Sequence, residues 1–269
     1  MKRLNIIISS LFLCLSPCVF AFDYASTVSS AEHSAQLRTG ADFTKNFRHG
    51  VKLRIGEDLR FDLYNSASGV AFSKSYTSLA LSYAPIKYFK IDGGYTLKIL
   101  GTKDWSDYNE WLRHRVFFSV TGSYKVNRVK LSVRERVMCE MRTDSVNPLE
   151  KAQNAWMLRS KLMVEYSCLS KPLKPYIWVE LVNTLNAPEY QQKYKNNDPT
   201  NNGYQYIRRV RTAVGLTWKI DKRNALDFYY RFNYGYDRDI NIKKKSGKIE
   251  LTEEKSFQHA IGVAYNLGW

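Results

Sequence analysis

The feature that most constrains this chain is a sustained alternation of apolar and polar side chains. The segment ALDFYYRFNYGYD (225–237) alternates throughout, and RVKLSVRERV (128–137) does so except at Glu135. A period of two places successive side chains on opposite faces of a β-strand, whereas a helix requires a period near 3.6. The alternation therefore predicts an all-β protein.

The alternating stretches define a series of long strands. They cover residues 34–43, 48–63, 75–84, 89–100, 110–124, 128–142, 156–167, 174–185, 205–219, 224–242 and 248–268. These strands exceed the five or six residues usual in soluble sheets and suit a tilted bilayer crossing. Short connections alternate with long polar ones, which is the layout of outer-membrane barrels. We predict an antiparallel transmembrane up-and-down β-barrel in which residues 22–269 form one domain.

The number of strands follows from where the chain ends must lie. If both ends lie on the periplasmic side, the count is even, and an additional outward strand must precede residue 34. Only residues 23–32 could supply it, although DYASTVSSAE is a poor strand sequence. We predict twelve strands, within a range of ten to fourteen.

Two other all-β architectures fit less well. A propeller blade needs four short strands within the ~40–50 residues that here contain two long ones. A soluble sandwich would direct its polar face to water, but this polar face is highly charged while many aromatic residues lie opposite it. Aromatic girdles at the two membrane surfaces explain the tryptophans near predicted strand ends. These are Trp105, Trp111, Trp156, Trp178, Trp218 and Trp269, of which Trp178 is alternatively an ordinary core residue.

Residues 1–21 have the pattern of a secretory signal peptide. Lys2 and Arg3 precede an apolar stretch, and Val19-Phe20-Ala21 places small residues where signal peptidase cleaves, after Ala21. No other apolar run reaches 18 residues, which excludes a helical membrane protein. We therefore expect the outer membrane of a Gram-negative bacterium. There the protein, with its net charge of +16, would interact with lipopolysaccharide and acidic solutes rather than with nucleic acid.

The end of the chain carries a more specific pattern. Alternate residues are apolar or aromatic up to the terminal one: Ile261, Val263, Tyr265, Leu267 and Trp269. This resembles the C-terminal assembly signal of Gram-negative outer-membrane proteins, in which a terminal Phe is more common. The resemblance implies recognition by the barrel-assembly machinery.

The last third of the chain also resembles a domain-of-unknown-function family of exported barrels. The segments ELVNTLN (180–186), RRVRTAVGLTWKI (208–220) and LDFYYRF (226–232) carry the likeness. The resemblance implies a barrel of about this length and says nothing about a substrate.

If the apolar face meets lipid, the polar face lines the lumen. The cations predicted to line it are Arg54, Arg60, Arg113, Arg115, Lys130, Arg134, Arg136, Arg159, Lys161, Arg209, Arg211 and Arg231. Inward acids are fewer, and rings of Arg and Lys favour anions in a pore. We predict a narrow anion-preferring porin for small acidic solutes, similar in plan to narrow twelve-strand porins for acidic sugars such as oligogalacturonate.

Two alternatives remain for function. Arg–Glu networks could fill the lumen and leave a non-conducting structural or adhesive barrel. A lipid-modifying hydrolase of the outer membrane would need a Ser close to a His on the barrel. His114 and His259 both fall on the outward face without a serine beside them, so we expect no enzyme activity.

Neither a cofactor nor a metal site is predicted, because Cys and His residues do not cluster. Cys139 and Cys168 should be free thiols near opposite ends of adjacent strands. Glu57 and Glu135 break the pattern, because both fall on the apolar face. We expect bulges, one near Gly56, to turn them inward; the alternative is that they mark a subunit interface.

Overall fold

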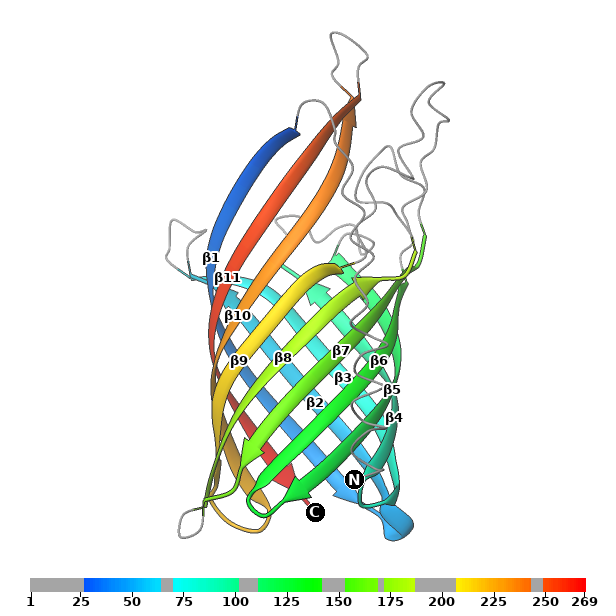
Figure 1. Ribbon diagram of the computed structural model, residues 1–269, viewed down its shortest axis with the longest axis vertical. Coiled ribbons are helices and arrows are strands. Elements are labelled where there is room, and N and C mark those ends of the chain that lie inside the picture. The colour runs from blue at the N-terminus through cyan, green and yellow to red at the C-terminus, as the bar shows by residue number, and fades with distance from the viewer. Residues whose placement is uncertain are drawn as a thin grey trace.

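The strands close into a barrel (Figure 1). The computed structural model describes residues 27–63, 70–101, 111–141, 153–168, 172–186, 207–242 and 249–269. Its strands are β1 (Thr27–Asn46), β2 (Val51–Asp62), β3 (Ala71–Ile86), β4 (Phe89–Leu100), β5 (Leu112–Val126), β6 (Val129–Met141), β7 (Ala155–Tyr166), β8 (Leu173–Thr184), β9 (Ile207–Lys219), β10 (Asn224–Ile242) and β11 (Ile249–Gly268). A 3-10 turn, η1 (Arg48–Gly50), joins β1 to β2. The predicted all-β barrel is confirmed.

The described residues form eleven strands, within the predicted range and one fewer than the preferred twelve. Residues 27–32 do not form a separate strand, because β1 is continuous from Thr27 to Asn46. A chain that reverses at every turn runs in the same direction in its first and eleventh strands. The closing pair, β1 with β11, is therefore parallel, while every other neighbouring pair is antiparallel as predicted.

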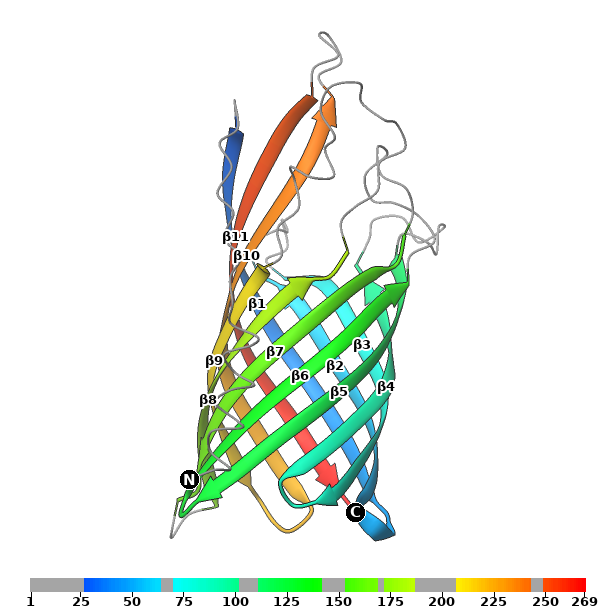
Figure 2. The same ribbon diagram turned by 45° about the vertical axis from the view of Figure 1, so that its right-hand side comes forward.

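The two ends of the barrel differ in their connections (Figure 2). We call the end with the short links, such as residues 87–88 and 127–128, the turn end, and the opposite end the loop end. Trp269 lies at the turn end and Thr27 at the loop end. Among the described residues, no helix is long and apolar enough to cross a membrane. The predicted signal peptide and most of the long connections fall outside the described residues.

Two short links show how local sequence sets the turns. Asn127 adopts a φ of 51°, a left-handed conformation that Asn tolerates, between β5 and β6. Asp221 accepts hydrogen bonds from the side chain of Asn224 and from the backbone N–H groups of Arg223 and Asn224. These hydrogen bonds lower the pKa of Asp221 and fix the start of β10.

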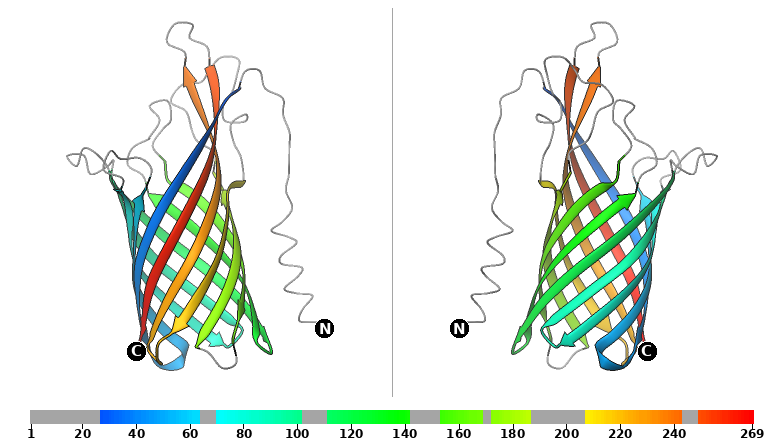
Figure 3. Two further views of the ribbon diagram at one scale, coloured as in Figure 1. Left: turned by 90° about the vertical axis from the view of Figure 1, so that its left-hand side faces the viewer. Right: turned by 90° about the vertical axis from the view of Figure 1, so that its right-hand side faces the viewer.

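Three strands project past the others at the loop end. β1, β10 and β11 are 20, 19 and 20 residues long and rise above the rim of the barrel (Figure 3). The ladder between β9 and β10 ends at Arg209 opposite Gly235, whereas β10 continues along β11 as far as Ile242. The upper parts of these strands thus form a three-stranded extension of the wall.

The outward face is apolar, as a lipid-facing surface requires. Leu81, Phe118, Val214 and Ile261 are all more than half exposed or close to it, with Ile261 at 66%. In water this much exposed apolar surface would be unfavourable, since burial contributes about 25 cal/mol per Å². The inverted distribution, with apolar residues outside and polar residues inside, is that of a barrel in a membrane.

The last strand closes the barrel at its turn end. The backbone N–H of Trp269 donates to Thr44 O at 2.9 Å, and that of Asn46 donates to Trp269 O at 2.8 Å. Ile261, Val263, Tyr265 and Leu267 of the predicted assembly signal therefore lie on β11 beside β1, at the seam that completes the ring, and Trp269 follows directly after β11.

Candidate functional site

All twelve cations predicted to line the lumen lie on the inward face. Contacts between strands that are not neighbours establish which face this is. Arg134 on β6 reaches Glu180 on β8, and Arg231 on β10 lies over the ring of Trp178 on β8. Such contacts skip one strand, which is possible across the concave side of the wall. The alternation within each strand then places the remaining cations.

A buried carboxylate organises the middle of the lumen. Glu180 is 1% exposed and accepts hydrogen bonds from three arginines on three different strands. Arg159 on β7 donates at 2.7 Å, Arg134 at 3.0 Å and Arg211 on β9 at 3.1 Å. Three guanidinium groups share a single carboxylate, so this cluster keeps a positive charge. We call these four residues the Glu180 cluster.

Carboxylates accompany the cations nearer the loop end. Glu140 on β6 forms ion pairs with Arg115 and with Lys98, the latter at 3.6 Å. Asp237 likewise pairs with Arg208 and Arg209. Further down the wall, Arg60 pairs with Asp58 at 2.7 Å and Arg54 with Asp42 at 3.7 Å. The carboxylates therefore neutralise much of the charge of these cations.

Other lumen cations lie against aromatic rings instead of carboxylates. Arg136 lies 4.2 Å from the ring centroid of Phe117, and Lys161 lies 4.2 Å from that of Trp178. Neither cation forms an ion pair within the part of the chain that the structure describes. The face of an aromatic ring attracts a cation but does not neutralise its charge. Trp178 therefore belongs to the lumen and not to a membrane girdle.

Some inward aromatic rings lie against a glycine of the neighbouring strand. A Cβ at Gly262 would lie 2.2 Å from the Tyr229 ring, and one at Gly94 would lie 2.7 Å from the Phe117 ring. The glycines thus make space for inward rings, and one of these rings, that of Phe117, lies against Arg136.

The lumen is narrow at the level of these contacts. Arg38, Gln36 and Glu180 are each at most 2% exposed although they lie inside the barrel. Several guanidinium atoms are buried without a hydrogen-bond partner. These include the Nε atoms of Arg38, Arg134, Arg136 and Arg211. Buried N–H donors of this kind are suited to an anion or an ordered water molecule.

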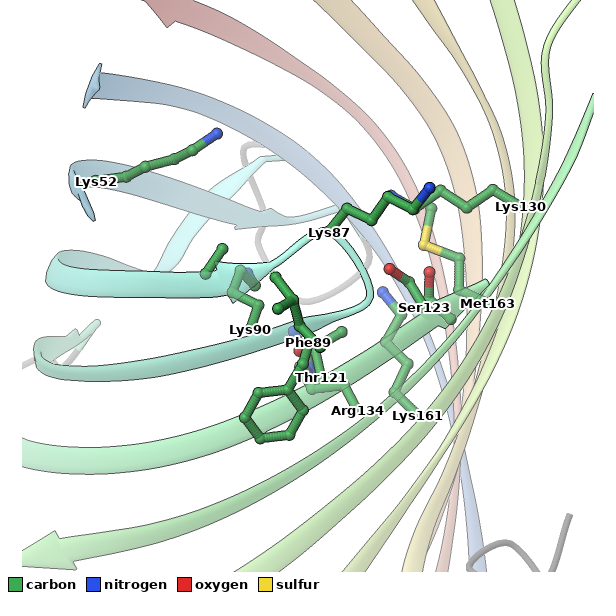
Figure 4. A pocket seen from close by; sticks show the side chains of 13 residues that line it. Lys52, Lys87, Phe89, Lys90, Thr121, Ser123, Lys130, Arg134, Lys161 and Met163 are labelled. Atoms are coloured by element: carbon green, nitrogen blue, oxygen red, sulfur yellow. The ribbon is translucent and has the colours of Figure 1, made fainter. Parts of the chain in front are cut away.

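A cavity of about 450 Å³ opens at the turn end of the lumen (Figure 4). Its cations come from β2, the β3–β4 turn, β4, β6 and β7, and are Lys52, Lys87, Lys90, Lys130, Arg134 and Lys161. The sequence analysis placed Lys130, Arg134 and Lys161 in the lumen but did not indicate that they share a cavity with Lys87.

The two glutamates on the apolar face remain outward, contrary to the predicted bulges. β2 pairs with β1 and β3 without a break at Gly56, and Glu135 lies within an unbroken ladder. On the lipid-facing side no water is available to the two carboxylates, and hydroxyl groups of the next strand donate hydrogen bonds to them instead. Ser75 and Thr77 donate to Glu57, and Ser160 donates to Glu135 at 2.6 Å.

His114 and His259, the two histidines predicted to lie outward, have tyrosine partners. Tyr95 OH bonds to Nδ1 of His114, and Tyr230 OH bonds to Nδ1 of His259 at 2.7 Å. Cys139 and Cys168 are free thiols, as predicted, at opposite ends of the β6–β7 pair. Among the described residues, no three His, Cys, Asp or Glu side chains gather as a metal site.

Fold and interior together define the class of protein: a transmembrane β-barrel with a cationic lumen. The chain belongs to the family described as Protein of unknown function (DUF2490), which matches residues 33–243. The resemblance to a barrel family without known function is thereby confirmed, over more of the chain than the last third. Among solved structures, the NanC porin matches with 9% identity and a TM-score of 0.43, covering 73% of this chain and 86% of that one. No curated protein matches the sequence.

Proposed function

We propose that the protein is a narrow, anion-preferring channel for small acidic solutes in a bacterial outer membrane. The observation that carries the proposal is the uncompensated positive charge of the lumen. Three arginines share Glu180, and Arg136, Lys161 and Arg231 have no carboxylate partner among the described residues. Fixed charge of one sign in a low-dielectric channel concentrates counter-ions of the other sign.

The remaining parts of the proposal concern location and assembly. A signal peptide cleaved after Ala21 would export the chain, and the apolar outer wall suits a bilayer. The alternating C-terminal residues, ending at Trp269, would be read by the barrel-assembly machinery. Lipopolysaccharide phosphates would contact basic residues at the loop end. No enzyme activity is proposed, because His114 and His259 each bond to a Tyr instead of a Ser.

One observation favours a second function. The nearly complete burial of Arg38, Gln36 and Glu180 shows side chains filling the middle of the lumen. A barrel that stays filled would not conduct and would act as a structural or adhesive protein through its loop end.

The test is the reversal potential of the refolded protein in a planar bilayer under a KCl gradient. We expect steady conductance with a reversal potential on the side of chloride selectivity. The Arg136→Glu variant should move the reversal potential toward cation selectivity, since it reverses a charge in the lumen.

Lys222→Glu makes the same change in charge in the exposed β9–β10 turn and should leave selectivity unaltered. Cation selectivity of the unmodified protein would refute the anion channel. The absence of conductance from a folded barrel would favour the filled structural barrel.

A further inference from the structure

The turn-end cavity differs from the rest of the lumen in having no acidic residue among the side chains that line it. Its cations are Lys52, Lys87, Lys90, Lys130, Arg134 and Lys161. Figure 4 shows their side chains entering the cavity from separate parts of the wall. We call this group the lysine mouth.

Few of these charges are neutralised. Lys90 pairs with Asp92 at 2.9 Å, and Arg134 has a share of Glu180. Lys52, Lys130 and Lys161 form no ion pair within the described part of the chain. Lys87 lies 4.7 Å from the Tyr88 ring centroid and likewise lacks a carboxylate. Like charges gathered in one cavity repel, so the site is stabilised when an anion enters.

Hydroxyl groups complete the donor set. Thr121, Ser123 and Ser132 line the same cavity and can donate to anionic oxygens between the cations. The lysine side chain is flexible and ends in a point charge with three donors. Several lysines can therefore each contact a different anionic group of one solute. A monovalent anion would engage only part of this array.

We infer that the lysine mouth is a binding site for a compact solute carrying several anionic groups, either phosphates or carboxylates. The inference rests on the cationic lumen of the proposed function and adds where the solute binds and that it is multiply charged. The loop-end cations already have Glu140 and Asp237 as partners, so they compete less well for the same solute. Binding is therefore strongest at the turn end, which corresponds to the periplasmic side.

The test uses isothermal titration calorimetry on the refolded full barrel in detergent, with inorganic tripolyphosphate as the probe. Tripolyphosphate should bind at least about tenfold more tightly than orthophosphate, since a factor of ten corresponds to about 1.4 kcal/mol and one additional charged contact supplies at least that much. The double variant Lys52→Gln/Lys130→Gln should weaken tripolyphosphate binding by about tenfold or more for the same reason.

The matched control is Lys219→Gln/Lys222→Gln, which removes two exposed lysines at the same end of the barrel outside the cavity. Its affinity should be unchanged. The single variant Lys87→Gln, in a turn, provides a second measurement in case the double variant does not fold. Citrate in place of tripolyphosphate distinguishes a site for carboxylates from one for phosphates.

Equal affinities of the two double variants, or of tripolyphosphate and orthophosphate, would overturn the inference. Binding is measured without conduction, so the two proposals fail separately. A non-conducting barrel that binds through these lysines would refute the channel and retain the site. An anion channel that binds tripolyphosphate independently of them would do the reverse.

Discussion

At the scale of single residues, the cations inside this barrel are neutralised to different degrees. Glu180 accepts hydrogen bonds from three arginines, while Arg136 and Lys161 lie over aromatic rings and have no carboxylate partner among the described residues. The alternation of the sequence was sufficient to place each cation inward, because side-chain direction in a strand is a local property. Which of these cations pair with Glu180 was not predictable from the sequence. It depends on which residues of β6, β7 and β9 come level with β8, and this is set by the tilt of the whole sheet.

The Glu180 cluster gives the first prediction. Glu180→Gln leaves Arg134, Arg159 and Arg211 buried without a counter-charge, so the free energy of unfolding should fall by about 3–5 kcal/mol. Urea titration of the protein in lipid vesicles measures this change. Glu165→Gln is the control, because its only ion-pair partner among the described residues is Lys174, at 3.4 Å. An equal loss in both variants would contradict a central role for the cluster.

Single residues also show where local pattern misleads. Bulges were expected at Glu57 and Glu135 because a lipid-facing carboxylate is costly. The chain instead keeps its register and supplies serine and threonine donors from the neighbouring strand. Those donors are distant in sequence, so inspection of β2 or β6 alone could not reveal them.

At the scale of elements, ten of the strands were predicted to within a few residues and β1 was not. The segment TVSSAE, residues 27–32, alternates poorly, and its pairing comes from β11 at the other end of the chain. A pairing between the two ends of the chain leaves no local trace in the sequence. The strand number therefore depended on the one ladder that sequence could not predict.

The parallel seam between β1 and β11 leads to the second prediction. Thr39 and Val263 are direct partners across it, and both side chains face outward. In a background without Cys139 and Cys168, the pair Thr39→Cys/Val263→Cys should form a disulfide on oxidation, since direct partners lie within bridging distance. Cleavage between the strands followed by electrophoresis detects the bond.

The shifted pair Thr39→Cys/Leu267→Cys serves as the control, because these positions are four residues out of register. More efficient cross-linking in the shifted pair would show that the seam has a different register.

At the scale of the whole molecule, the distribution of polarity is inverted relative to a soluble protein. Val214, near the middle of β9, is 50% exposed, while Arg231 on β10 lies inside. Period two predicted both faces, and the highly charged polar face opposite many aromatic residues indicated that the apolar face meets lipid. The diameter of the lumen was not predictable, because it depends on how long side chains fold together across the barrel.

The third prediction compares the two faces. Val214→Arg should reduce the stability of the barrel in lipid vesicles by about 2–4 kcal/mol, because a cation then faces the hydrocarbon. Arg231→Leu should be much less harmful, since it removes a cation that has no carboxylate partner among the described residues. Heat-modifiable electrophoretic migration after refolding measures the folded fraction. Equal loss for the two variants would argue against a lipid-facing outer wall.

The odd number of strands in the described part of the chain also limits how the barrel can be rearranged. A barrel with an even number has both chain ends at one rim, where a short linker can join them and new ends can be opened elsewhere. Here Thr27 and Trp269 lie at opposite rims, at the far ends of two 20-residue strands. At about 3.3 Å per residue, a linker would have to pass along the full length of the barrel. Joining the end of β11 to the start of β1 therefore needs either a linker that spans the barrel or a further strand that carries the chain back.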